Sequence, residues 1–185
     1  MNKKNIPNYI TIFRFTLVPI ICYLITMKTF IFAIIATWLF LLACISDFLD
    51  GYLARKLNSE SEFGRCFDNI ADKVLNICII CVLLFFHKIW LLPSLLVIAR
   101  EVLISSFREY AALNCNKRIN VDIFGKAKTT FQFIALLILI IPKHNYLNFY
   151  YLNLLGNIIF SVSASLSIIS AFLYLFKHFR YSYER

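Results

Sequence analysis

The sequence has few charged residues and no stretch that would serve as a linker between domains. Charged residues make up 16% of its 185 residues, against 61% hydrophobic residues and a mean hydropathy of +0.74. An ordinary soluble domain is about 45–50% apolar, so this composition excludes one. The length, with no internal repeat or low-complexity segment, predicts a single domain spanning residues 1–185.

Histidines and paired cysteines are also scarce, which excludes several familiar catalytic arrangements. His87 and His144 fall in predicted connections and His178 in the C-terminal tail, so no Ser/His/Asp or Cys/His group emerges. Cys78 and Cys81 have CxxC spacing, but the chain has no second such pair. We interpret them as small apolar side chains within a helix, not as a redox or zinc site.

Long apolar runs are abundant instead. A helix needs about 20 residues to cross the hydrocarbon layer, and the chain has room for about six such helices. The apolar runs predict an all-α integral membrane protein with six transmembrane helices. The first run is too long for a signal peptide and is expected to be an anchor. The predicted helices cover residues 8–27, 30–57, 60–86, 89–114, a stretch from about 122, and 151–176.

The formal net charge of +9 suits an anionic membrane surface or anionic substrates. A nucleic-acid surface is the weaker interpretation, because the cations are dispersed between apolar spans. Sixteen of the 19 cationic residues fall on one side of the predicted topology, and only Lys28, Lys88 and Lys143 on the other. This bias predicts a multi-pass cell-membrane protein with both termini in the cytoplasm. Arg14 is expected to extend from its helix to the membrane surface.

Only ten residues are acidic, and four of them are aspartates between residues 47 and 72. Asp47 and Asp50 share a helix face near the end of the second predicted helix, and Asp68 and Asp72 share one near the start of the third. Because these helices are antiparallel, the four carboxylates should lie at similar depth, on the cytoplasmic side.

Four converging carboxylates would repel one another, and each costs roughly 2.5–3.5 kcal/mol at mid-bilayer. Divalent cations relieve that repulsion, and hard oxygen ligands suit Mg²⁺ or Mn²⁺. The alternative is that the aspartates are solvated helix ends paired with Arg55, Arg65 and Lys73. Ordinary ion pairing would not require small residues beside the carboxylates. Gly51, Ala54 and Gly64 stand there, and two acidic faces with small residues beside them are typical of a polyanion-binding metal site.

The complete pattern is Asp-x2-Asp-Gly-x2-Ala-Arg-x8-Gly-x3-Asp-x3-Asp, from Asp47 to Asp72. It resembles the signature of the CDP-alcohol phosphatidyltransferases, integral membrane enzymes of phospholipid synthesis. The resemblance implies that an alcohol attacks the β-phosphorus of a CDP-linked lipid and releases CMP. It further implies that two divalent ions are held by Asp47, Asp50, Asp68 and Asp72, and that Asp72 is also the general base.

The resemblance also implies a set of positions that bind the CDP-lipid. For Asn8 and Thr11, roles as capping and turn residues are equally compatible with the sequence, and Ser61 has the alternative of a hydroxyl beside a helix cap. The full set is Asn8, Thr11, Gly51, Ala54, Arg55, Ser61 and Gly64.

Three segments, residues 98–101, 106–109 and 125–130, resemble the branch of the family whose acceptor is glycerol 3-phosphate. That acceptor is dianionic and needs an electropositive pocket. The candidate phosphate-binding residues are Arg100, Arg108, Arg118, Lys126 and Lys128. An equally open alternative is that Arg100 and Arg108 are neutralised by Glu101 and Glu109.

The predicted reaction converts CDP-diacylglycerol and glycerol 3-phosphate into phosphatidylglycerophosphate and CMP, toward phosphatidylglycerol and cardiolipin. Within the family, serine, inositol phosphate or phosphatidylglycerol are the alternative acceptors. A small multi-pass anion transporter is the alternative from another class, although it leaves the aspartate and small-residue spacing unexplained. The resemblance also implies a homodimer, and no nucleic-acid partner is expected.

Overall fold

The computed structural model describes the backbone over most of the chain and the side chains over a smaller part of it. The described backbone covers residues 6–27, 29–57, 62–115, 123–141 and 149–183. The described side chains are those of residues 12–27, 29–46, 70–107, 127–141 and 150–176.

The described residues form six α-helices and no β-strand, as the apolar runs predict. The helices are α1 (Ile6–Thr26), α2 (Phe30–Leu57), α3 (Glu62–Phe85), α4 (Leu91–Cys115), α5 (Ile123–Ile140) and α6 (Phe149–Tyr183). The predicted bounds of the first four helices and the start of the fifth differ from these by no more than two residues.

The predicted end of the last helix, residue 176, is wrong by seven residues, since α6 continues to Tyr183. The apolar run stops at Phe176, but Lys177 to Tyr183 contains neither glycine nor proline to end the helix. The helix therefore continues past the end of the apolar run into the polar residues that follow it.

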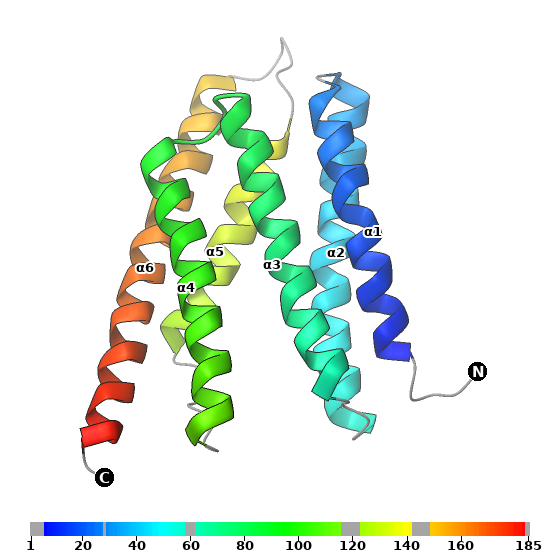
Figure 1. Cartoon of the computed structure of the whole chain (residues 1–185). Helices are drawn as coiled ribbons and strands as arrows, with labels where there is room; N and C mark the ends of the chain where they lie inside the picture. Colours follow the sequence, from blue (N-terminus) through cyan, green and yellow to red (C-terminus); the bar gives the residue numbers. More distant parts are fainter. Residues whose placement is uncertain (1–5, 28, 58–61, 116–122, 142–148, 184–185) are drawn as a thin grey trace.

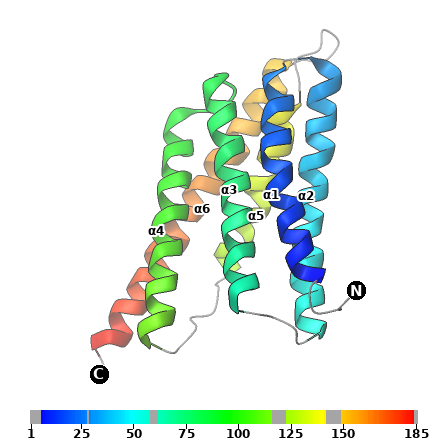
Figure 2. The ribbon, with the colours of Figure 1, turned by 45° about the vertical axis from the view of Figure 1, so that its right-hand side comes forward.

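The six helices pack as one bundle with α3 at its centre. In both views α3 lies between the α1–α2 pair and the α4–α6 pair (Figures 1 and 2). α1 packs against both α2 and α3, α5 packs along α6, and α4 also packs against α6. The first turn of α1 and the last turn of α6 lie at the same end of the bundle. That end also holds the end of α2 and the start of α3 (Figure 1).

The interior is built from apolar residues on the inward face of each helix. Leu17, Val18 and Ile21 of α1 are buried at the three- and four-residue spacing of one helix face. Phe40 of α2 meets Phe133 of α5 edge to face, with ring centroids 6.0 Å apart. This contact joins the two halves of the bundle.

The bundle also buries charged and polar side chains while large apolar side chains cover its outside. Arg14 is fully buried, at 0% exposure, so the expectation that it extends to a surface is wrong. Its helix face is turned inward because α1 packs against two neighbours. Trp38 and Leu103, by contrast, are each more than 60% exposed. An apolar exterior around a partly polar interior favours contact with lipid.

Within the described residues, one segment, Tyr150–Phe176, is long and apolar enough to cross a membrane, with 27 residues. Three shorter apolar helical stretches lie in α1, α2 and α5, namely Ile12–Thr26, Phe30–Ser46 and Ala127–Ile140. The six helices are therefore observed, and the number that span a membrane stays a prediction.

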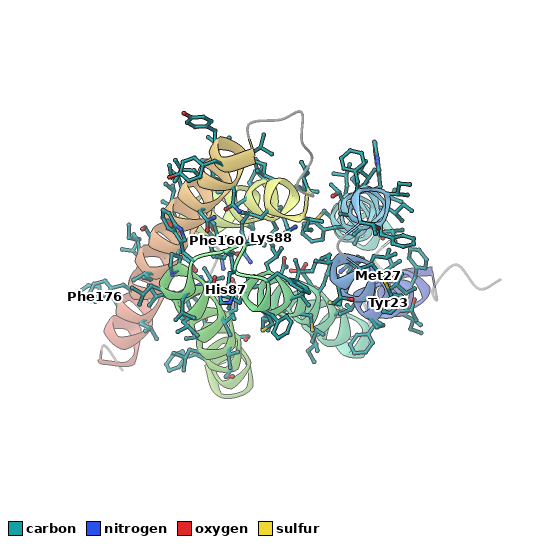
Figure 3. All side chains as sticks on the ribbon, turned by 90° about the horizontal axis from the view of Figure 1, so that it is seen from above. Tyr23, Met27, His87, Lys88, Phe160 and Phe176 are labelled. Atoms are coloured by element: carbon teal, nitrogen blue, oxygen red, sulfur yellow. The ribbon has the colours of Figure 1, made fainter. Side chains whose placement is uncertain are left out.

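The turn between α3 and α4 closes the end of the bundle opposite the aspartates. His87 has a φ of 54°, which ends α3 in a left-handed cap. The His87 amide donates to the Leu84 carbonyl, and the Lys88 amide donates to the Leu83 carbonyl, both at 2.9 Å. Figure 3 looks onto His87 and Lys88 at this end. The histidine therefore serves the turn, far from the predicted site.

Candidate active site

The ends of α2 and α3 bring the four motif aspartates to matching levels of the backbone. Asp47 lies ten residues before the end of α2, and Asp72 lies ten residues after the start of α3. Asp50 and Asp68 lie seven and six residues from the same ends. At a rise of about 1.5 Å per residue, each pair stands at nearly equal depth from one end of the bundle. The side chains of Asp47, Asp50 and Asp68 lie outside the described residues.

Asp72 is half-buried, and its carboxylate has a partner on the same helix. The side-chain amide of Asn76, one turn further along α3, donates to the Asp72 carbonyl oxygen at 3.0 Å and to Asp72 Oδ1 at 3.4 Å. Asn76 is only 7% exposed. A buried amide thus restricts the orientation of the carboxylate predicted to act as a base.

The positions predicted to bind the CDP-lipid are distributed over the same end of three helices. Asn8 and Thr11 lie in the first half of α1, and Gly64 lies in the first turn of α3. Gly51, Ala54 and Arg55 lie in the last two turns of α2, and Ser61 lies outside the described residues. α1 packs against both α2 and α3, so all the described positions lie on α1 or on a helix that neighbours it.

Two of the five predicted acceptor-binding cations meet at one carboxylate. Glu101 Oε1 accepts hydrogen bonds from Arg100 Nη1 at 3.3 Å and from Lys128 Nζ. All three side chains are at least 85% buried, and they connect α4 with α5. The neutralisation of Arg100 by Glu101 is therefore observed. It does not exclude a second role for the same cations toward an anionic ligand.

The other three predicted cations are located only in part. Arg108 lies in the second half of α4 and Lys126 in the first turn of α5, and their side chains lie outside the described residues. Arg118 falls between these two helices in the sequence and also lies outside the described residues. The helix ends that carry Arg108 and Lys126 lie at the same end of the bundle as the aspartates (Figure 2).

Sequence reasoning missed the polar groups that surround these side chains. Asn76 continues the four-residue period of Gly64, Asp68 and Asp72, so that signal was available. Ser167 and Ser170 of α6, which bind Arg100, are about 70 residues distant in sequence and gave no comparable signal.

The donor set of the motif has the chemistry that a divalent cation requires. Four carboxylates at two matching levels would be costly together in an apolar bundle, whereas Mg²⁺ and Mn²⁺ favour such oxygen ligands. Asp72, whose side chain is described, is neither buried nor fully exposed. The residues present therefore fit a divalent metal site.

Known proteins resemble this chain along nearly its whole length. A protein of Rickettsia bellii named CDP-diacylglycerol–glycerol-3-phosphate 3-phosphatidyltransferase is 40% identical over 171 residues, covering 92% of this chain and 93% of its own. Proteins of the same name from Wigglesworthia glossinidia brevipalpis and Haemophilus influenzae are 38% and 36% identical. They cover 96% and 94% of this chain, and 94% and 92% of their own. Residues 4–175 match the CDP-alcohol phosphatidyltransferase family, which the motif predicts. The chain therefore belongs to the CDP-alcohol phosphatidyltransferase family.

Proposed function

We propose that this protein transfers the phosphatidyl group of CDP-diacylglycerol to glycerol 3-phosphate, giving phosphatidylglycerophosphate and CMP. The observation that carries the proposal is the complete aspartate motif on α2 and α3 at one end of the bundle, in a chain 36–40% identical to proteins named for this reaction. Family membership alone supports the class of reaction, and the named relatives support the acceptor.

In this reaction a hydroxyl oxygen of glycerol 3-phosphate attacks the β-phosphorus of CDP-diacylglycerol. A new phosphorus–oxygen bond forms, and the bond to CMP breaks with its electron pair leaving on the CMP phosphate. The hydroxyl proton passes to the carboxylate of Asp72, which acts as general base. The hydrogen bond from Asn76 supports this role, because it limits the rotation of that carboxylate.

Asp47, Asp50, Asp68 and Asp72 would hold two divalent ions, Mg²⁺ or Mn²⁺. Bound there, the ions would neutralise the charge of the diphosphate and of the departing CMP. Chelation by EDTA should therefore abolish CMP release, and added Mg²⁺ or Mn²⁺ should restore it. Full activity in thoroughly chelated protein would refute the metal assignment.

The acceptor is assigned to the cations carried by α4, by α5 and by the connection between them. Arg100 and Lys128 are buried beside one carboxylate. In the sequence, Arg108, Arg118 and Lys126 fall between the second half of α4 and the first turn of α5. A dianionic phosphate requires such a cluster, whereas serine would not.

The protein is proposed to span the cell membrane several times, with both termini and the aspartates in the cytoplasm. The apolar exterior of the bundle and the bias of cations in the sequence toward one side of the predicted topology support this orientation. A reporter enzyme fused after Arg185 should be active in the cytoplasm. Activity confined to the opposite side would overturn the orientation. A homodimer is part of the proposal and is tested by chemical crosslinking in membranes.

The decisive experiment is an acceptor panel on purified protein with Mg²⁺ and CDP-diacylglycerol. CMP release that depends on glycerol 3-phosphate is the expected result. Release that depends instead on serine, inositol phosphate or phosphatidylglycerol would keep the protein in its family but assign it a different acceptor. No CMP with any acceptor would contradict an enzymatic function and favour anion transport.

A further inference from the structure

A cluster of buried charged groups lies where α4, α5 and α6 meet, with Glu101 at its centre. One oxygen of this carboxylate accepts hydrogen bonds from both Arg100 and Lys128. Glu101 itself is 15% exposed, so the cluster is almost closed to water. Hydrogen bonds between charged groups in such surroundings have strong directional preferences.

Arg100 is also fixed from the side of α6. Its Nε donates to the Ser167 carbonyl oxygen at 3.2 Å, and its Nη2 lies 3.4 Å from Ser170 Oγ. The backbone at Lys128 is fixed by the same helix, since Ser163 Oγ donates to the Lys128 carbonyl oxygen at 2.9 Å. Three helices therefore determine where these two cations lie.

The cluster lies within electrostatic reach of the motif helix. Lys73, the residue after Asp72 on α3, is among the cations whose charge acts on Glu101. α3 also packs against both α4 and α5. The helices that carry Glu101 and Lys128 are therefore both neighbours of the helix that carries Asp72.

We propose that Glu101 is a positioning residue, which holds Arg100 and Lys128 together in the arrangement that receives the phosphate of the acceptor. The proposal rests on the function proposed above. Two cations repel one another unless an anion lies between them, so an empty pocket would otherwise spread apart. A shared carboxylate holds the two cations in place before the phosphate arrives. This reduces the conformational entropy that their side chains lose when the phosphate binds.

A purely electrostatic role makes the opposite prediction. Glu101 adds a negative charge near a dianionic ligand, so its removal would strengthen the long-range attraction of glycerol 3-phosphate. The sign of the change in KM therefore separates the two roles. A merely structural ion pair would lower stability without a selective change in KM.

The test compares Glu101→Gln with wild-type protein in CMP release at varied glycerol 3-phosphate. We expect KM for glycerol 3-phosphate to rise about tenfold or more, while KM for CDP-diacylglycerol changes little, because the lost interaction orders only the acceptor pocket. Glu101→Asp, which retains the charge, should restore part of the loss. An unchanged or lower KM in Glu101→Gln would overturn the proposal.

A milder pair of variants keeps the proposal testable if Glu101→Gln fails to fold. Ser170→Ala removes one partner of Arg100 and retains every charge, so KM for glycerol 3-phosphate should rise about twofold to fivefold. Ser165→Ala is its matched control on the same helix, because Ser165 is exposed and its described hydrogen bond is to the Ser161 carbonyl within α6. Equal KM values in the two serine variants would refute the positioning role. Wild-type protein without any glycerol 3-phosphate-dependent CMP release would instead refute the function itself.

Discussion

Asn76 donates its side-chain amide to the carboxylate of Asp72 from one helical turn further along α3, with Nδ2 3.4 Å from Oδ1. The same nitrogen lies 3.0 Å from the Asp72 carbonyl oxygen, while Asn76 Oδ1 is buried without a described partner. A buried polar group left partly unsatisfied lowers stability by about 1–3 kcal/mol. We infer that this residue serves the reaction more than the fold.

Asn76→Leu should therefore separate activity from stability. The variant loses the donor that orients Asp72, so kcat should fall about threefold to thirtyfold. It also removes a buried acceptor that has no partner among the described residues, so the unfolding temperature should stay equal or rise. Ile77→Leu, a conservative change at the next residue, is the control for helix packing. A destabilised Asn76→Leu protein with wild-type kcat would contradict this role.

Asp72→Asn and Asp68→Ala test the two roles given to the aspartates of α3. Asp72→Asn retains the shape of the side chain but cannot accept the hydroxyl proton, so kcat should fall about 10²- to 10⁴-fold. Asp68→Ala removes a metal ligand and should abolish CMP release. Circular dichroism in detergent should show unchanged helix content in both. Glu62→Gln, outside the four-residue period, is the control, and normal turnover in either aspartate variant would refute the assignment.

The contact between α5 and α6 depends on the absence of a side chain at Gly156. A Cβ atom there would lie 2.9 Å from Cγ and Cδ2 of Leu139 and 3.2 Å from Cγ2 of Ile138. Gly156→Ala should therefore displace Leu139 and destabilise the protein by about 1–3 kcal/mol. The measurement is thermal unfolding in detergent. Leu139→Val in the same protein should recover part of the loss, and an unaffected single variant would contradict this packing.

Asn157 of α6 holds the turn between α3 and α4 in place through hydrogen bonds. Its Oδ1 accepts from the Trp90 amide at 2.8 Å, and its Nδ2 donates to the Lys88 carbonyl oxygen at 3.0 Å. Asn157→Leu should lower the free energy of unfolding by about 1–3 kcal/mol for each buried group left without a partner. KM for both substrates should not change, because this turn lies at the far end of α3 from Asp72. A changed KM with normal stability would refute a purely structural role.

The helices could be predicted from the sequence because each apolar run is long and its ends carry polar residues. The end of α6 could not, since nothing between Lys177 and Tyr183 breaks a helix. The buried position of Arg14 was also missed. Whether an arginine in an apolar run extends to a surface or lies inside a bundle depends on which helices pack around it.

The candidate site was predictable where its residues recur along one helix. Regular spacing indicated the aspartates, and continuing that spacing by one more step gives Asn76. The partners of Arg100 on α6 were not predictable, because they come from a helix that meets α4 only in the folded bundle. Side-chain hydrogen bonds between distant segments are a property of packing and leave no local pattern.

The most direct test follows isotope-labelled glycerol 3-phosphate through the reaction of the purified protein with CDP-diacylglycerol and Mg²⁺. Mass spectrometry measures the labelled lipid, and chromatography measures CMP. We predict labelled phosphatidylglycerophosphate and CMP in equal amounts from wild-type protein, and neither above background from Asp72→Asn. CMP release without labelled lipid, or labelled lipid at the wild-type rate from Asp72→Asn, would contradict the account.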